Sequence, residues 1–152
     1  MNIVNNKIQF DEDDVFDLDT TFAEIIHAGL IKFKEGPRNS IPSQFFKSQD
    51  NITHDDEQAA GILWEQVIDE MIFAFSNIDL LYEYEKIAGT PYDYTKECFD
   101  KNNVFKPYVK AGYTTQMIEE WQNNRAKWEA SMNERIQYGR QLFIKFFDNL
   151  WI

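Results

Sequence analysis

Apolar residues recur three or four positions apart along three long stretches of the chain, and this helical period most constrains what it can fold into. The stretches begin near Phe22, Leu63 and Met117. The alternation of apolar and polar residues that a half-buried strand needs is found only in a short segment at residues 7–10. We therefore predict an all-α protein, a bundle of three or more helices with a long irregular connector at about residues 87–113.

The first helix is bounded by residues that start and stop helices. Asp17 or Asp19 is expected to cap its N-terminus, and Gly36-Pro37 is expected to end it. Residues 36–53 contain two prolines and several small polar residues, which predicts a loop, with Phe45 and Phe46 packed onto the core.

A second helix is expected to begin at a Thr53 cap and to run to about Lys86, before Gly89-Thr90-Pro91 stops it. Its predicted core stripe includes Leu63, Val67, Met71 and Phe75, with Trp64 and Ile68 flanking that stripe.

A third helix is expected to start at Thr114 or Thr115. Its stripe passes through Trp121 and, near the C-terminus, through Phe143 and Phe147. Gly139 interrupts this stretch and is expected to bend or break the helix. With an irregular start at residues 1–16, the chain then forms a single helical domain over residues 1–152.

The net charge of -11 arises from 26 acidic and 15 basic residues in a chain of 152. Its distribution is uneven: residues 1–57 and 58–104 are acidic, whereas residues 105–152 hold 5 acids and 7 bases. Binding to duplex nucleic acid is disfavoured, because affinity for the phosphate backbone needs a basic surface. A small anionic ligand near the C-terminal third remains compatible with this distribution.

Cys98 is the single cysteine, which excludes an internal disulfide framework and a zinc site built on cysteines. The sequence has no apolar run of about 18 residues, and its N-terminus lacks the pattern of a signal peptide. We expect a protein that does not enter membranes and that acts in the cytoplasm.

Two acidic motifs suggest enzymes. Asp17-Leu-Asp19-Thr-Thr resembles the Asp-x-Asp-x-Thr signature of haloacid-dehalogenase-type phosphatases, but the acidic run at residues 11–14 cannot be the buried strand that this chemistry needs. Glu65, Asp69 and Glu70 on the second helix could chelate Mg²⁺, as in all-α nucleotide pyrophosphohydrolases. Those enzymes use paired Glu-x-x-Glu and Glu-x-x-Asp motifs, so a solvated helix face is favoured. We predict no catalytic residues, no metal site and no cofactor.

Aromatic and basic residues suggest a binding function instead. Arg125 lies between Trp121 and Trp128 on one helix, and aromatic planes beside guanidinium groups can clamp a base and its phosphates. The predicted ligand-binding residues are Lys32, Lys34, Arg38, Arg135, Tyr138 and Arg140. The same aromatic residues also suit core packing and a seam between subunits, so we expect a homo-oligomer.

Three segments together resemble a family of small uncharacterised bacteriophage proteins. They are Asp17–Glu35 with its Leu-Asp-x-Thr motif, Trp64–Phe75 with Asp-x-Met-Ile-x-Ala-Phe, and Gly139–Trp151 with its Leu-Phe…Phe…Leu-Trp ending. The resemblance covers roughly half the chain, and residues 90–135 lie outside it. It implies a phage origin and action in the host cytoplasm, and it carries no established activity.

Three functions follow as hypotheses. The first is a non-enzymatic protein that sequesters a nucleotide-derived host immune signal. The second is a protein–protein inhibitor of a host factor, or an accessory protein of the virion. The third is a Mg²⁺-dependent all-α nucleotide pyrophosphohydrolase.

Overall fold

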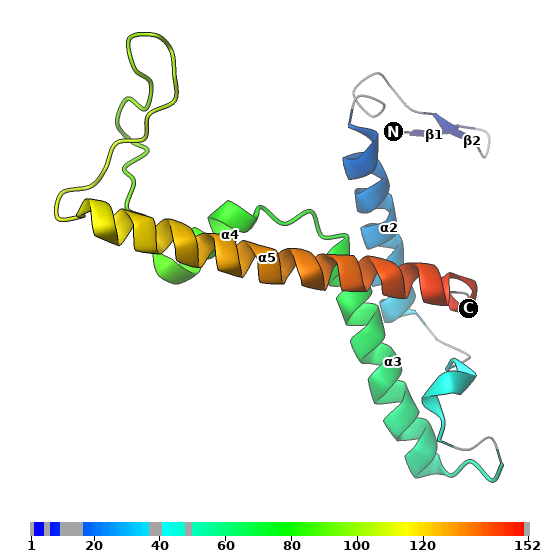
Figure 1. Ribbon diagram of the computed structural model, residues 1–152. Helices are drawn as coiled ribbons and strands as arrows, with labels where there is room; N and C mark the ends of the chain where they lie inside the picture. Colours follow the sequence, from blue (N-terminus) through cyan, green and yellow to red (C-terminus); the bar gives the residue numbers. More distant parts are fainter. Residues whose placement is uncertain (1, 5–6, 10–16, 37–40, 48–49, 151–152) are drawn as a thin grey trace. The chain divides into compact units, whose positions relative to one another are not determined.

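The computed structural model describes residues 2–4, 7–9, 17–36, 41–47 and 50–150, and its architecture is all-α after a short N-terminal hairpin (Figure 1). Strands β1 (Asn2–Val4) and β2 (Lys7–Gln9) pair antiparallel, with Ile3 opposite Ile8. The helices are α2 (Leu18–Glu35), α3 (His54–Ala74), α4 (Leu80–Ala88) and α5 (Thr115–Phe146), with 3-10 turns η1 (Ser43–Phe45) and η2 (Phe147–Asn149). None of the helices described is long and apolar enough to cross a membrane. The all-α prediction is confirmed, and the expected connector follows α4.

The chain divides into two compact units. The first unit comprises residues 1–77 and 134–152, and the second comprises residues 78–133. Helix α5 is continuous and contributes residues to both. The single-domain prediction stays a prediction, and each unit is described here by itself.

Helix ends follow the capping residues that the sequence indicates. Helix α2 begins after Asp17, although the Asp17 side chain makes no capping hydrogen bond, and it ends at Gly36, whose N–H donates to the carbonyl of Lys32. Thr53 caps α3 in a capping box: its hydroxyl accepts from the Asp56 N–H, and the Asp56 carboxylate accepts from the Thr53 N–H. The Thr53 hydroxyl also donates to the Asp56 carboxylate at 2.7 Å, and this bond, together with that from the Thr53 N–H, holds the pKa of Asp56 below its ordinary value.

The expected second helix is wrong in its length, because the chain leaves the helix between Phe75 and Asp79. The Ser76 hydroxyl donates to the Phe73 carbonyl, and Asn77 adopts a left-handed conformation with φ of 50°. Asp79 then starts α4 by accepting a hydrogen bond from the Tyr82 N–H at 3.0 Å. Asparagine tolerates left-handed backbone, and aspartate is a strong N-cap, so local chemistry here outweighs the continuous apolar stripe.

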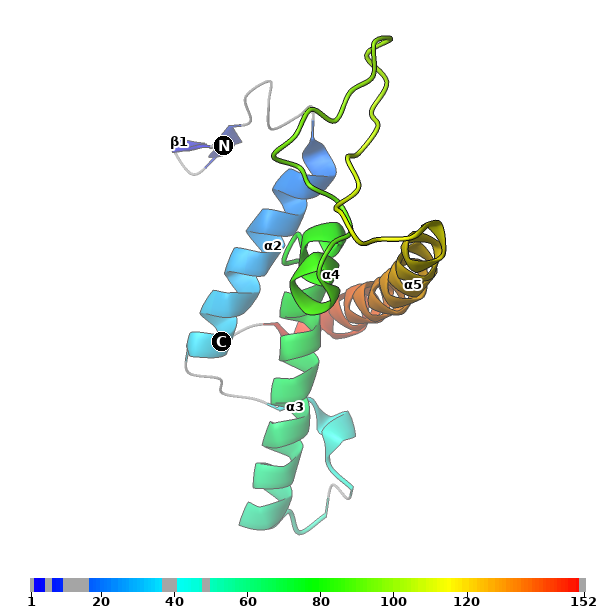
Figure 2. The ribbon, with the colours of Figure 1, turned by 90° about the vertical axis from the view of Figure 1, so that its left-hand side faces the viewer.

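In the first unit, α2 and α3 run antiparallel and side by side (Figure 2). Trp64 is the centre of the core: its ring lies 6.4 Å from the ring of Phe33, 5.7 Å from that of Phe45 and 5.3 Å from that of Phe146. The expected packing of Phe45 on the core is therefore confirmed. The buried cluster consists of Leu30, Phe33, Trp64, Ile68, Met71, Leu142 and Phe146.

The buried face of α3 is rotated toward Trp64 relative to the predicted stripe, although Met71, which belongs to that stripe, is fully buried as predicted. Trp64 and Ile68, predicted to flank the core, are fully buried, whereas Leu63 is 46% exposed. On α5 the predicted Trp121 is buried, and near the C-terminal end of the helix Leu142 and Phe146 are buried, whereas the predicted Phe147 is 62% exposed. The rotation follows from small residues, because Ala60 and Ala74 are also buried on the Trp64 face.

Gly139 does not break α5, which continues to Phe146. It is buried where α5 crosses α3, and a Cβ atom at this position would overlap the Glu70 carbonyl oxygen and lie 2.6 Å from the Cβ of Ala74. The glycine therefore permits the close approach of two helix backbones. From the sequence alone, a glycine in this role cannot be distinguished from one that kinks a helix.

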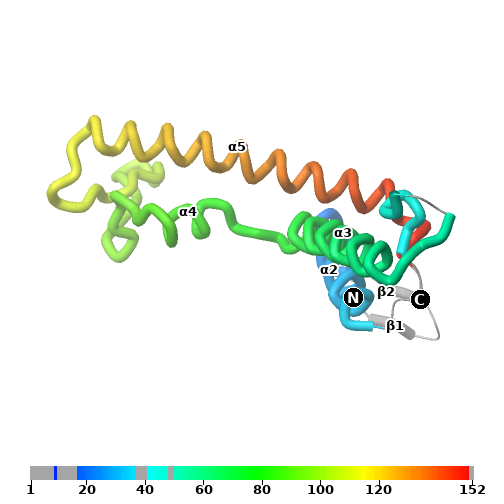
Figure 3. Tube along the Cα trace, turned by 90° about the horizontal axis from the view of Figure 1, so that it is seen from below, coloured from blue at the N-terminus to red at the C-terminus, as the bar shows by residue number. Residues whose placement is uncertain are grey.

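The second unit packs α4 against the N-terminal part of α5 (Figure 3). Tyr84, the buried residue of α4, places its ring 5.5 Å from both the Trp121 and the Trp128 rings. The seven-residue spacing of the two tryptophans thus serves as a packing seam for α4.

Substituting Gly139→Ala should destabilise the protein by about 1–3 kcal/mol, because the added methyl group must push α5 away from the backbone of α3. Gly29→Ala is the matched control, since nothing lies within 4 Å of its would-be Cβ in helix α2. That change should stabilise by about 0.5–1 kcal/mol through helix propensity. Urea unfolding followed by circular dichroism measures both. Equal effects of the two substitutions would contradict the close approach.

Candidate binding site

The connector after α4 folds back on itself as an irregular hairpin, residues 89–114, which extends from the helices of its unit (Figure 1). Its two legs are joined by backbone hydrogen bonds, from the Asp93 N–H to the Tyr108 carbonyl at 2.8 Å and from the Lys110 N–H to the Pro91 carbonyl at 2.9 Å. Isolated bridges pair Tyr92 with Val109 and Phe99 with Phe105. We call this segment the aromatic hairpin.

The tip of the aromatic hairpin is a tight turn built by Asp100. Its carboxylate accepts hydrogen bonds from the N–H groups of Asn102 at 2.8 Å and Val104 at 3.0 Å. Asn103 supplies the left-handed residue, with φ of 60°. Asp and Asn at these places are the usual means of closing such a turn, so the tip is pre-organised by its own side chains.

Apolar side chains at this tip face solvent. Phe99 is 54% exposed and Phe105 is 57% exposed, with their rings edge to face at 5.7 Å. Val104, Tyr108 and Val109 add further exposed apolar surface on the same hairpin. Contiguous exposed apolar residues of this kind mark interaction surfaces in folded proteins.

The base of the hairpin is anchored to α5. The indole N–H of Trp121 donates to the Gly89 carbonyl at 2.9 Å, and Gln122 donates to the Tyr92 hydroxyl at 2.9 Å. The Tyr92 ring meets the Trp121 ring edge to face at 5.7 Å, and Pro91 is fully buried. The exposed tip is thus held on a firm base.

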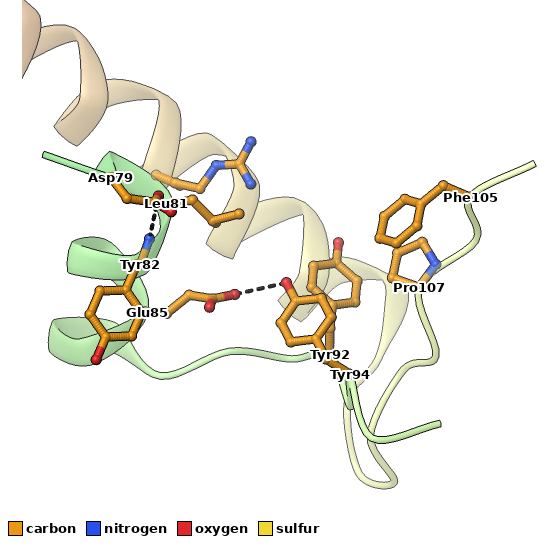
Figure 4. Close-up of a pocket in the computed structure, with 9 residues that line it drawn as sticks. Asp79, Leu81, Tyr82, Glu85, Tyr92, Tyr94, Phe105 and Pro107 are labelled. Carbon is orange, nitrogen blue, oxygen red and sulfur yellow. Dashed lines mark hydrogen bonds between the residues drawn. The ribbon is translucent and has the colours of Figure 1, made fainter. Parts of the chain in front are cut away.

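A cavity of about 370 Å³ lies between α4, α5 and this hairpin within the second unit (Figure 4). Tyr82, Tyr92, Tyr94 and Phe105 contribute aromatic rings to its wall.

Two carboxylates, those of Asp79 and Glu85, line the same cavity. The Glu85 carboxylate accepts a hydrogen bond from the Tyr94 hydroxyl at 2.8 Å. Desolvation by burial, followed by this hydrogen bond, raises the pKa of Tyr94 above its ordinary value.

Arg125 is the basic residue in the lining of this cavity, and it already has partners. Its guanidinium carbon lies 5.4 Å from the centre of the Trp121 ring, and its Nε atom is 3.2 Å from a carboxylate oxygen of Glu129. The expected stacking of Arg125 on an indole is present. The lining of the cavity thus holds two acids, Asp79 and Glu85, against one base, so its formal charge is one negative.

The predicted ligand-binding lysines of α2 are engaged by acidic residues. Lys34 is hydrogen-bonded to the Asp69 carboxylate, and its Nζ atom is 3.9 Å from a carboxylate oxygen of Glu65. Lys32 is highly exposed and lies 3.5 Å from Glu35. Arg38 lies outside the described residues.

The predicted residues of α5 have separate surroundings in the first unit. Arg135 forms a bidentate pair with Glu70, with both N–O distances at 2.8 Å, and its guanidinium carbon lies 3.8 Å from the centre of the Phe73 ring. Arg140 lies 5.9 Å from the centre of the Phe75 ring. Tyr138 lines a cavity of about 520 Å³ whose other lining residues are Phe45, Leu63, Gln66, Val67, Glu70 and Leu142. Among the described residues of the predicted site, Lys32, Lys34, Arg135 and Arg140 are not in that lining.

Glu65, Asp69 and Glu70, the candidate Mg²⁺ ligands, are therefore the acids that contact the candidate phosphate ligands. Glu65 and Asp69 approach Lys34 on α2, and Glu70 approaches Arg135 on α5. Among the residues that the structure describes, no group of three or more His, Cys, Asp or Glu is placed to hold a metal ion. These charges join α3 to its two neighbouring helices.

The Arg135–Glu70 pair should show a coupling free energy of about 0.5–1 kcal/mol in a double-mutant cycle of Arg135→Ala and Glu70→Ala, because its bidentate geometry is good and partial exposure weakens it. The Lys32–Glu35 pair is the control and should give a coupling near zero, since both side chains are mostly exposed. Urea unfolding supplies the free energies. Negligible coupling for Arg135–Glu70 would indicate that Arg135 is available for another role.

Comparison of the chain with known protein families, with curated proteins and with solved structures gives no match. The resemblance to bacteriophage proteins thus stays a prediction carried by the three segments that suggest it. The function has to be inferred from the surface of the chain itself.

Proposed function

We propose that this chain is a non-enzymatic binding protein whose partner is another protein, and that the aromatic hairpin is its contact element. The observation that carries the proposal is the exposed pair Phe99 and Phe105 on a turn that Asp100 pre-organises. On the resemblance to bacteriophage proteins, the partner is a host protein and the site of action is the host cytoplasm.

Pre-organisation is what makes such a hairpin suited to binding. A two-stranded hairpin is marginally stable alone, and here Trp121 and Gln122 fasten its base to α5. A rigid element loses little conformational entropy on binding, so more of its contact energy appears as affinity. Aromatic side chains at the centre of an interface supply most of that energy.

Sequestration of a nucleotide-derived signal receives less support than a protein partner. Lys34 and Arg135, which were expected to bind phosphates, are paired with carboxylates, and a phosphate would have to displace these acids. A Mg²⁺-dependent hydrolase also receives less support, because the Glu65 and Glu70 carboxylates approach Lys34 and Arg135 instead of converging on one point where a metal ion could bind.

Photo-crosslinking tests the protein partner directly. The full chain is expressed in bacterial cells with p-benzoylphenylalanine at Phe99 or at Phe105, and the control carries it at Ile62 of α3, which is exposed to the same extent as Phe99. We expect a discrete crosslinked product with one host protein from the two hairpin positions and much less of it from Ile62.

Two results would overturn the proposal. Crosslinks of equal yield at Phe99, Phe105 and Ile62 would mean that the hairpin has no special role. A product of twice the mass of the chain would mean that the hairpin joins two copies of this protein. Calorimetry against cyclic and linear nucleotides complements the test, and we expect it to detect no binding.

A further inference from the structure

We propose that the cavity beneath the aromatic hairpin is a recognition site for a basic side chain, arginine or lysine, presented by the protein partner. This inference rests on the proposed function and names the chemistry that the same surface recognises. It follows from the lining of the cavity, which places aromatic rings and two carboxylates around one opening.

The carboxylates of Asp79 and Glu85 favour a positively charged group in the cavity. Figure 4 shows Glu85 directed across the opening toward Tyr94, whose hydroxyl holds it at 2.8 Å. Asp79 stands at the start of α4, where it accepts the Tyr82 N–H. A hydrogen-bonded carboxylate can accept a further charge-assisted bond, and an incoming guanidinium or ammonium group provides it. A phosphate would meet two like charges there.

The aromatic rings supply the second attraction, because the face of a tyrosine or phenylalanine ring carries partial negative charge. The second unit already uses this interaction on its own lysines. The Lys86 ammonium lies 4.9 Å from the centre of the Tyr82 ring, and the Lys96 ammonium lies 4.1 Å from that of Tyr108. The ring centres of Tyr92 and Tyr94 are 6.2 Å apart, and both rings form part of the wall that a cationic side chain would contact.

The size of the cavity and the position of Arg125 are consistent with an arginine or lysine side chain as the occupant. A cavity of about 370 Å³ is at the small end of ligand sites, so it suits one long side chain with its flanking backbone. Arg125 offsets only one of the two acids in the lining, and its guanidinium is directed to the Trp121 ring and to Glu129, whose carboxylate oxygen lies 3.2 Å from its Nε atom. Phe105 belongs both to the exposed tip and to the cavity, so a partner that covers the hairpin also reaches the cavity.

The test uses N-acetylarginine methylamide as the probe and N-acetylcitrulline methylamide as its uncharged isostere, each titrated into the full ¹⁵N-labelled chain. We expect the arginine derivative to shift the amide resonances of residues 79–94 saturably, and the citrulline derivative to bind at least about five-fold more weakly. Adenosine monophosphate, an aromatic anion, should cause no saturable shift in these residues.

Glu85→Gln and Glu83→Gln form a matched pair of variants on α4, since both remove one carboxylate charge and only Glu85 lines the cavity. The amide oxygen of the glutamine at position 85 still accepts from Tyr94, which preserves the fold, and the unperturbed spectrum of each variant verifies this. Affinity for the arginine derivative should fall about five-fold in Glu85→Gln and less than about two-fold in Glu83→Gln.

The inference is overturned if no saturable shift occurs, if citrulline binds as well as arginine, or if both variants lose affinity equally. Its failure is separable from that of the proposed function. Crosslinking of a host protein at Phe105 without arginine binding would remove only the cation site. Arginine binding without any crosslink at Phe99 or Phe105 would remove the protein partner and leave the site.

Discussion

The close approach of α5 to α3 at Gly139 is the constraint on which the first unit depends. With hydrogen in place of a Cβ atom, the α5 backbone reaches the Glu70 carbonyl, and one turn to either side the flanking residues find their partners. Arg135 reaches the Glu70 carboxylate and the Phe73 ring, while Leu142 and Phe146 join the cluster around Trp64. A larger residue would separate the helices and weaken both the ion pair and the aromatic core, since dispersion contacts decay within an ångström.

The charges of this unit have a structural role that their sequence positions conceal. Read along the chain, Lys34 and Arg135 suggest a phosphate site, and Glu65, Asp69 and Glu70 suggest a Mg²⁺ site. In space the acids of α3 pair with Lys34 on α2 and with Arg135 on α5, so each set of charges accounts for the other. The bidentate bond with Glu70 raises the pKa of Arg135 above its ordinary value, so the guanidinium keeps its positive charge. Only three-dimensional pairing could distinguish these interpretations.

Local chemistry accounts for what the sequence predicts well. Thr53 and Gly36 act on the backbone within a few residues of themselves, and the ends of α2 and the start of α3 are where these residues indicate. The sequence does not predict the break at Asn77, although Asn77 and Asp79 are both signals for it, because apolar residues continue at helical spacing through this segment. The rotation of the α3 core from Leu63 to Trp64 depends on which neighbours are small enough to allow contact, and that is a property of packing between helices.

The aromatic hairpin and its cavity cannot be predicted from the sequence either, because they also depend on contacts between residues that are distant in the chain. The aromatic hairpin has no alternating pattern, since its legs are held by a few backbone bonds and by anchors such as Trp121, which lies 32 residues from the Gly89 carbonyl that it binds. The residues from Asp100 to Asn103 are typical of a turn, so a turn could be predicted there. The exposure of the aromatic side chains beside it could not, because turn residues do not indicate which neighbouring side chains face solvent. An apolar tip on an anchored base costs solubility unless another surface covers it. A partner that buries Phe99 and Phe105 and places a cation beside Glu85 would cover this exposed apolar surface. The hairpin and the cavity beneath it would then act as one binding surface.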